Sequence, residues 1–264
     1  MASGYIAAMD PPVGQPRILI ADDDAVSLRF LTSALGELGC AVMAVANGAA
    51  TLDACAATRF DLLLLDRRMP DRGGATLLWA LRKHGVETAA IATSAELDAR
   101  TRAELNGAGY IDALTKPIGL DALARTLAAH LPNWRDPRRH QSTSAEVTSR
   151  ADANAGDILD DDAGLACVGG DRTTLHALRD LLADELGTLQ GQLTATATPH
   201  PSELADTLHR LRAACRYCGA TALGEAAAHL ETAIRTNDAN RQAQFAQFID
   251  TCTRTREALL AAAG

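Results

Sequence analysis

The feature that most constrains the fold of this chain is a run of four leucines that ends in an aspartate. Residues 62–65 are all leucine, and Asp66 follows them directly. A continuous apolar run of this length is typical of a strand buried on both faces of a parallel sheet, and it is too short for most helices. The run predicts that Asp66 lies at the carboxyl edge of a sheet, where open α/β sheets bind ligands. On this stretch alone, a role for Asp66 in capping the next helix or turn is an equal alternative.

The same alternation of short apolar strands and amphipathic helices continues through residues 17–131. Parallel strands need crossover connections, so the pattern predicts an α/β, doubly wound, five-stranded parallel sheet. The expected strands are 18–21, 41–46, 61–65, 87–92 and 109–114. The expected helices run from Val26 to Leu38, then to about residue 58, and over 75–84, 97–106 and 119–131.

The remaining chain divides by composition into an arm, a linker and a helical domain. Residues 1–16 carry four Pro and Gly residues among positions 11–16 and show no periodicity, which predicts a flexible arm. Residues 132–156 are polar and proline-containing, so they read as a linker that does not fix the orientation of its two neighbours. Residues 157–264 are helical throughout, which predicts an all-α four-helix bundle. Its expected helices are 171–194, 201–218, 220–236 and 240–262, after a short lead at 159–167.

Charge and composition argue against several classes of function. The formal net charge of −8 divides into about −2 for residues 17–131 and about −6 for residues 157–264, and only 3% of residues are aromatic. A basic face and stacking aromatics are therefore missing, so we expect no nucleic-acid partner. No apolar run is long enough to span a bilayer, and the first fifteen residues contain no Lys or Arg. We expect no membrane insertion, a cytoplasmic location and reduced cysteines.

Polar side chains that can carry chemistry follow four of the predicted strands. Asp22 and Asp23 come after the first strand, Asp66 after the third, Thr93 near the end of the fourth and Lys116 after the fifth. The carboxyl ends of parallel strands share one edge, so these groups should converge. Crowded carboxylates bind a hard cation such as Mg²⁺. A cation, a lysine and a hydroxyl could together neutralise a phosphoryl group on Asp66.

With Met69-Pro70, Gly74 and Lys116-Pro117, these residues resemble the receiver domain of two-component response regulators over roughly residues 17–131. The resemblance implies a flavodoxin-like fold and makes Asp66 the phosphoacceptor. It implies that Asp23, Asp66 and the backbone carbonyl of Arg68 bind Mg²⁺, that Asp22 acts through water, and that Thr93 and Lys116 contact the phosphoryl oxygens. It also implies a cis bond at Lys116-Pro117, which an X-Pro bond permits at small cost.

Two departures from the receiver pattern concern switching. Receivers commonly place an aromatic residue three positions before the lysine, where this chain has Ala113, and Tyr110 does not occupy that position. The usual coupling between the hydroxyl and the aromatic residue is therefore in doubt. Arg67 and Arg68 beside the acceptor are also unusual and could alter the lifetime of the phosphoaspartate in either direction.

A second candidate site lies in residues 202–222, where apolar residues at helical spacing form one stripe. At about 100° per residue, His209 points away from that stripe and should face solvent, with Arg212 beside it. The run from His209 to Ala213, followed by Gly219-Ala220, resembles the histidine phosphotransfer (HPt) domain, in which His-x-Leu-Lys-Gly precedes Gly-Ala. The segment 164–171 resembles that family's opening. The resemblance implies that His209 accepts a phosphoryl group and that Arg212, in place of the usual lysine, pairs with it.

A metal or redox site is a rival interpretation, because Cys215 and Cys218 form a C-x-x-C pair near His209. Both cysteines lie on the core stripe while His209 points away, so the three could not share a tetrahedral metal. We expect buried structural thiols. The run 160–162 of three aspartates lacks a partner lysine, and it reads as a helix cap.

The sequence thus predicts a phosphorelay protein without an ATP-binding kinase domain. Asp66 would accept a phosphoryl group from a sensor or hybrid histidine kinase or from a phospho-HPt domain, and His209 would pass groups to or from a downstream receiver. The alternative is an interaction protein in which the receiver controls access to the HPt face without direct transfer between Asp66 and His209. A redox or zinc protein built on Cys215 and Cys218 is the third hypothesis.

Overall fold

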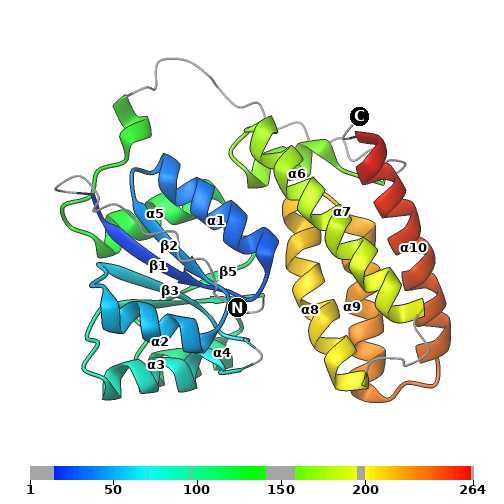
Figure 1. Ribbon diagram of the computed structural model, residues 1–264, viewed down its shortest axis with the longest axis horizontal. Helices are drawn as coiled ribbons and strands as arrows, with labels where there is room; N and C mark the ends of the chain where they lie inside the picture. The colour runs from blue at the N-terminus through cyan, green and yellow to red at the C-terminus, as the bar shows by residue number, and fades with distance from the viewer. Residues whose placement is uncertain (1–14, 70, 96, 141–157, 195–199, 263–264) are drawn as a thin grey trace.

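The structure is a computed structural model that describes residues 15–69, 71–95, 97–140, 158–194 and 200–262. Figure 1 shows an N-terminal α/β domain and a C-terminal helical bundle side by side. Nearly all of the predicted arm and the larger part of the predicted linker lie outside the described residues. No described helix is both long enough and apolar enough to cross a membrane.

The N-terminal domain is the predicted doubly wound sheet. All strand pairs are parallel, and the strand order is β2-β1-β3-β4-β5. The strands are β1 (Arg17–Ala21), β2 (Ala41–Val45), β3 (Leu62–Asp66), β4 (Ala90–Ser94) and β5 (Asp112–Thr115). The helices between and after them are α1 (Ala25–Glu37), α2 (Gly48–Ala57), α3 (Gly74–Lys83), α4 (Ala99–Gly107) and α5 (Leu120–His130).

The leucine run forms the centre of this domain. β3 pairs with β1 on one side and β4 on the other, and all four leucines are buried. Side chains alternate across a strand, so Leu62 and Leu64 join the core under α1 and α5, whereas Leu63 and Leu65 join the core on the opposite face. Each contributes about 1.5–3 kcal/mol by burial. Burial on both faces holds Asp66 rigidly at the end of β3.

The largest shifts from the predicted boundaries are at the starts of two strands: β4 begins at Ala90 rather than near residue 87, and β5 at Asp112 rather than near residue 109. Arg82 at the end of α3 donates hydrogen bonds to the carbonyls of Val86 and Thr88 at 2.7 and 2.8 Å. These carbonyls are held by a side chain, so residues 86–89 form an irregular segment rather than part of the strand.

The C-terminal domain is the predicted bundle with its short lead. Its helices are α6 (Asp161–Cys167), α7 (Arg172–Thr194), α8 (Pro201–Cys218), α9 (Thr221–Thr236) and α10 (Arg241–Ala262). Asp160 caps α6 by accepting the N–H of Ala163, as expected for the aspartate run. Gly219 ends α8 with φ +71°, and a Cβ there would clash with the carbonyl oxygen of Asp160. Only glycine fits this junction.

The two domains share a packed interface, in which α1 lies against α7 and α8. Tyr217 of α8 is fully buried, and its ring centroid lies 4.7 Å from that of Phe30 in α1. Its hydroxyl accepts the backbone N–H of Ile118 at 2.9 Å. One continuous apolar cluster runs through both domains. The orientation is therefore defined by direct packing, although a flexible linker alone would leave it open.

The segment after α5 packs on the receiver-like domain rather than behaving as linker. Trp134 is buried, and its indole N–H donates to the carbonyl of Leu38 at 2.9 Å. Arg138, in a short 3₁₀ helix (η1, Pro137–His140), pairs with Asp121 and Asp136. The N-terminal domain thus extends past residue 131, because the apolar ring of Trp134 is buried against it.

Candidate functional site

The acidic turn after β1 supplies one capping aspartate and two that face the sheet edge. Asp24 caps α1 by accepting the N–H groups of Val26 and Ser27. Asp22 is completely buried, and its Oδ2 lies 2.6 Å from Nζ of Lys116. Burial raises the pKa of Asp22 to about 8, although Lys116 acts in the opposite direction.

Asp66 is held by two donors at the end of β3. Its Oδ1 accepts the backbone N–H of Arg68 at 3.0 Å, and its Oδ2 accepts a hydrogen bond from Nζ of Lys116 at 2.6 Å. Burial disfavours the charged form of Lys116, but Asp22 and Asp66 outweigh it and hold the pKa of Lys116 well above its usual value. Lys116 therefore carries a positive charge between the two carboxylates at any working pH. The peptide bond Lys116-Pro117 is cis.

Asp22, Asp23 and Asp66 form the group of candidate metal ligands found among the described residues. Each offers a carboxylate oxygen, and the three oxygens lie within 4.8 Å of one another. Asp23 Oδ1 is buried without a hydrogen-bond partner, which is costly unless something binds it. All-oxygen donors with an unpaired buried carboxylate oxygen suit a hard cation such as Mg²⁺.

Two neighbouring hydroxyls at the end of β4, those of Thr93 and Ser94, are candidates for contact with the site. Thr93 is buried in β4 and pairs in register with Asp66. Ser94, the next residue, lines a small cavity that also contains Asp66 and Lys116. Successive side chains of a strand point to opposite faces, so the one-residue difference decides which hydroxyl faces the cavity. The geometry favours Ser94, while a role for Thr93 stays a prediction.

His209 lies in α8 and is oriented by a residue that the sequence reasoning missed. Its Nδ1 lies 3.1 Å from Oε1 of Glu231 in α9. Burial raises the pKa of Glu231, but hydrogen bonds from His209 and Arg212 outweigh it and lower the pKa to about 2. An ionised carboxylate can only accept, so Nδ1 carries the proton and Nε2 of the neutral ring carries the lone pair. The available signal was a glutamate within the largely apolar run 226–234.

Arg212, the predicted partner of the phosphoryl group, forms an ion pair with Glu231 in this structure. Its guanidinium donates to Oε2 of Glu231 at 2.9 Å, and Arg235 donates to Oε1 at 3.1 Å. Arg212 therefore helps to hold the carboxylate that orients His209. Its contact with a phosphoryl group stays a prediction.

The expectation that His209 faces solvent is wrong, because the other domain covers it. Its side chain is only 13% exposed. The helical phase was correct, since the ring points away from the bundle core, but it points into a cavity of about 20 Å³ at the domain interface. The residues lining this cavity come from both domains: Asp24, Asp66, Arg68, Ser94, Ala95, Lys116, His209, Arg210 and Ala213.

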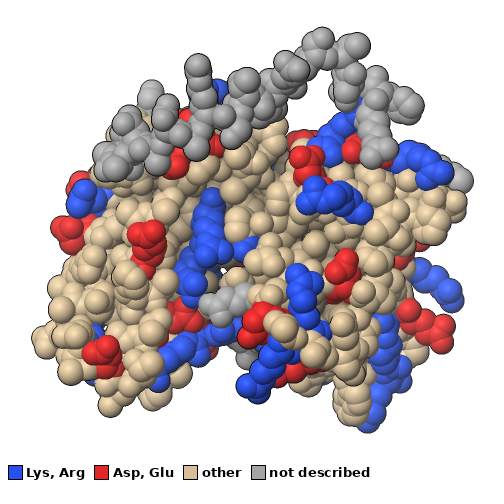
Figure 2. Space-filling view, turned by 180° about the vertical axis from the view of Figure 1, so that it is seen from behind, with Lys and Arg blue, Asp and Glu red and all other residues tan. Residues whose placement is uncertain are grey.

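Arginines from the bundle reach across to the acidic edge. Arg210 lies 3.3 Å from Oδ2 of Asp23, and Arg216 donates to the carbonyl of Lys116 at 3.1 Å. In the other direction, Arg68 lies 3.8 Å from Asp206 of α8. Figure 2 shows Lys and Arg side chains near the middle of the rear face, where the domains meet. Sequence reasoning missed Arg210, because only the docked structure gives it a partner.

Tyr110 contacts the acceptor loop even though it is not at the usual aromatic position. Its side chain is buried, and a Cβ added to Gly74 would lie 2.7 Å from its hydroxyl oxygen and 2.9 Å from the carbonyl oxygen of Asp66. Ala113, at the usual position, is buried in β5. Tyr110 therefore places an aromatic ring behind the loop after β3, although it lies three residues before the usual aromatic position at Ala113.

The C-x-x-C pair is part of the bundle core. Cys215 and Cys218 are fully buried free thiols, and burial raises the pKa of both. A thiol kept protonated by burial is a poor metal ligand and a poor nucleophile.

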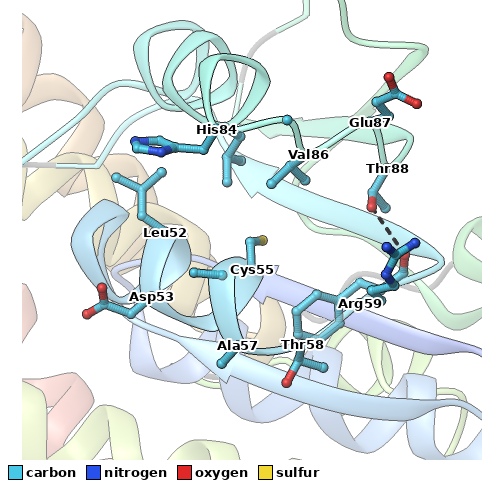
Figure 3. Close-up of a pocket in the computed structure, with 14 residues that line it drawn as sticks. Leu52, Asp53, Cys55, Ala57, Thr58, Arg59, His84, Val86, Glu87 and Thr88 are labelled. Atoms are coloured by element: carbon cyan, nitrogen blue, oxygen red, sulfur yellow. Dashed lines mark hydrogen bonds between the residues drawn. The ribbon is translucent and has the colours of Figure 1, made fainter.

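A wider groove of about 1060 Å³ lies at the opposite edge of the sheet, between the ends of α2 and α3. Figure 3 shows Leu52, Cys55, His84 and Val86 along its sides. It contains none of the acidic-edge residues, so it is separate from the site at Asp66.

Comparison with known proteins decides the family. Residues 18–128 match the response regulator receiver domain family, and residues 174–262 match the Hpt domain family. The chain consists of a receiver domain followed by an Hpt domain. Its role is in a two-component phosphorelay.

Several relatives are histidine kinases that contain a region similar to this chain as one part. The sensor histidine kinase GacS of Pseudomonas protegens is 31% identical over 85% of this chain, and BarA of Escherichia coli K12, a signal transduction histidine-protein kinase, is 25% identical over 88%. The chain spans about a quarter of each relative's length. The Francisella response regulator 1452 receiver domain is 30% identical, with a TM-score of 0.42, over 44% of this chain and 95% of its own.

Proposed function

We propose that Asp66 and His209 exchange a phosphoryl group within one chain. The observation that carries this proposal is that both residues line the same interface cavity, although they are 143 positions apart in the sequence. Asp66 and His209 come from different domains, and each is oriented by its own partners. Packing of Tyr217 against Phe30 stabilises this arrangement.

The chemistry follows from the charges at the site. The lone pair on Nε2 of His209 attacks the phosphorus of phospho-Asp66, a P–N bond forms, the P–O bond to Asp66 breaks, and Asp66 leaves as a carboxylate. Lys116 stabilises that carboxylate through its hydrogen bond to Oδ2. Glu231 accepts the hydrogen bond from Nδ1–H and stabilises the positive ring that forms. The reverse transfer uses the same groups.

The remaining roles belong to the same proposal. Asp22, Asp23 and Asp66, with the carbonyl of Arg68, would hold Mg²⁺, which neutralises phosphoryl charge when bound. The phosphoryl donor would be a sensor or hybrid histidine kinase, and a separate receiver would take the group from His209. We place the protein in the cytoplasm, with domains at 17–131 and 157–264 and with residues 132–140 packed on the first of them.

Control of access without direct transfer is the second candidate. The burial of both acceptors favours it: the side chain of Asp66 is 10% exposed and that of His209 is 13% exposed. An outside protein could reach either residue only after the domains separate. This function and internal transfer differ in whether label passes from Asp66 to His209 in one molecule.

Chemical stability of the two phosphates provides the test. The purified protein is labelled with radioactive acetyl phosphate and Mg²⁺ and then treated with alkali, which removes phosphoaspartate and retains phosphohistidine. We expect alkali-stable label in the wild type and none in Asp66→Asn or His209→Gln. The first-order rate should not change with protein concentration, because the transfer is intramolecular.

A mixture of the Asp66→Asn and His209→Gln chains is the matched control for transfer between molecules. Label on histidine in the mixture at the wild-type rate would show that docking within one chain is not used. Label on Asp66 alone in the wild type would refute direct transfer and support control of access.

A further inference from the structure

Arg210 is an arginine from the Hpt domain placed on a predicted magnesium ligand of the receiver. Its guanidinium lies 3.3 Å from Oδ2 of Asp23, whose side chain is 9% exposed. It is braced from its own helix, because it also donates to the hydroxyl of Thr207 at 3.3 Å. Burial raises the pKa of Asp23, and the nearby positive charge of Arg210 opposes that effect. Arg210 therefore supplies the charge compensation that a cation would give Asp23.

Space at the interface limits what can join this contact. The cavity beside Arg210 and Asp66 has a volume of about 20 Å³, which holds about one water molecule. Mg²⁺ is smaller than most cations but keeps several of its waters when it binds carboxylates. Beside Asp66 the docked His209 and Arg210 thus leave little room for the waters that a bound Mg²⁺ keeps. Its double charge would also repel the guanidinium in a site with little water.

We propose that Arg210 is a positioning residue that holds His209 over the receiver only while Asp23 is free of Mg²⁺. It pairs with Oδ2 of Asp23, and a metal on the free Oδ1 would lie close to its positive charge, so docking of the Hpt domain in this pose and binding of Mg²⁺ oppose one another. This inference rests on the proposed function in one respect, since it takes Asp23 as a magnesium ligand.

The position of Arg210 in the helix connects this exchange to the phosphoacceptor. Arg210 directly follows His209 in α8, and Arg216 and Tyr217 of the same helix bind the loop after β5. A shift of α8 that withdraws Arg210 also shifts His209. Metal loading would then open the small cavity, making room for a phosphoryl group.

Calorimetric titration of the full chain with MgCl₂, with no phosphodonor present, tests the competition. Binding of Mg²⁺ to Arg210→Gln should be about fivefold tighter or more, which is the lower end of typical coupling between sites. Arg210→Lys, which keeps the charge, should bind more weakly than Arg210→Gln. Arg254→Gln is the matched control, since Arg254 pairs with Asp250 within α10 and its loss changes net charge equally. Unchanged or weaker binding by Arg210→Gln would overturn the proposal.

The reciprocal measurement uses only the wild type, so it does not depend on the folding of a variant. Coupling is mutual, so Mg²⁺ must weaken docking. We expect faster modification of His209 by diethyl pyrocarbonate in Mg²⁺ than in KCl of equal ionic strength, read by peptide mass spectrometry against exposed His176. An equal or slower rate at His209 would contradict the inference. Neither assay involves phosphoryl transfer, so a failed competition leaves the proposed transfer untouched, and failed transfer leaves the competition intact.

Discussion

Tyr217→Phe should loosen the contact between the two domains without disturbing either of them. The ring and its packing against Phe30 are kept, so the change removes only the hydroxyl. That hydroxyl accepts the N–H of Ile118, a residue that is 1% exposed. A buried donor left without a partner costs about 1–3 kcal/mol, whereas in the separated domains water would satisfy it. The equilibrium between docked and open forms should therefore shift toward opening by roughly 5- to 150-fold.

Modification of His209 by diethyl pyrocarbonate reports this shift directly. The docked side chain is 13% exposed, so most modification passes through the open form and its rate should rise several-fold in Tyr217→Phe. Tyr110→Phe is the matched control, because Tyr110 is also buried but its hydroxyl has no hydrogen-bond partner among the described residues. It should leave the rate unchanged. A rate at His209 in Tyr217→Phe equal to that of the wild type would show that this hydrogen bond does not hold the domains together.

Three further changes test the packing and the charges. Burial raises the pKa of Glu185 to about 7, so the native state holds a proton that the unfolded chain releases near pH 4.5. That contribution to stability, up to about 3 kcal/mol, is complete below pH 4.5 and is lost as the pH rises through 7. Between pH 5 and pH 8 the free energy of unfolding in urea should therefore fall less in Glu185→Gln than in the wild type. An equal fall in both proteins would contradict the assignment. Glu231→Gln leaves Arg212 without its carboxylate and should lower the free energy of unfolding by about 2 kcal/mol, since the arginine is partly solvated; an unchanged urea midpoint would refute this. Gly74→Ala places a Cβ 2.7 Å from the Tyr110 hydroxyl and 2.9 Å from backbone, so we expect a loss of about 1–3 kcal/mol in thermal unfolding, and an unchanged Tm would mean that the loop moves freely.

The fold was predictable wherever a local pattern decides the structure. The leucine run of β3 could only be buried on both faces, and the helices of the bundle begin and end within two residues of their predicted positions because proline, glycine and capping aspartates mark their ends. The boundary of β4 failed because the apolar pattern does not show which nearby side chain binds the backbone. Its displacement depends on hydrogen bonds from the Arg82 side chain, four and six residues before the carbonyls that accept them.

The residues of the site also separate into those that the sequence could predict and those that it could not. Asp22, Asp23, Asp66 and Lys116 follow strands whose ends must meet, so their convergence was predictable from topology. The choice between Thr93 and Ser94 depends on one residue of register at a strand end. Glu231, Arg210 and the covering of His209 depend on packing between elements far apart in sequence, and a helical wheel for α8 alone cannot include a second domain.

Mutual covering of the two acceptors changes the affinity that an outside partner needs. A separate receiver that takes a phosphoryl group from His209 must bind the face that the chain's own receiver occupies. Its apparent affinity is the intrinsic affinity multiplied by the open fraction, so an open fraction of about 1% would weaken binding about a hundredfold. The tethered domain also competes at an effective concentration around millimolar. Whatever raises the open fraction therefore strengthens every external contact of His209 by the same factor, whether it is the loss of the Tyr217 hydrogen bond or the withdrawal of Arg210 from Asp23.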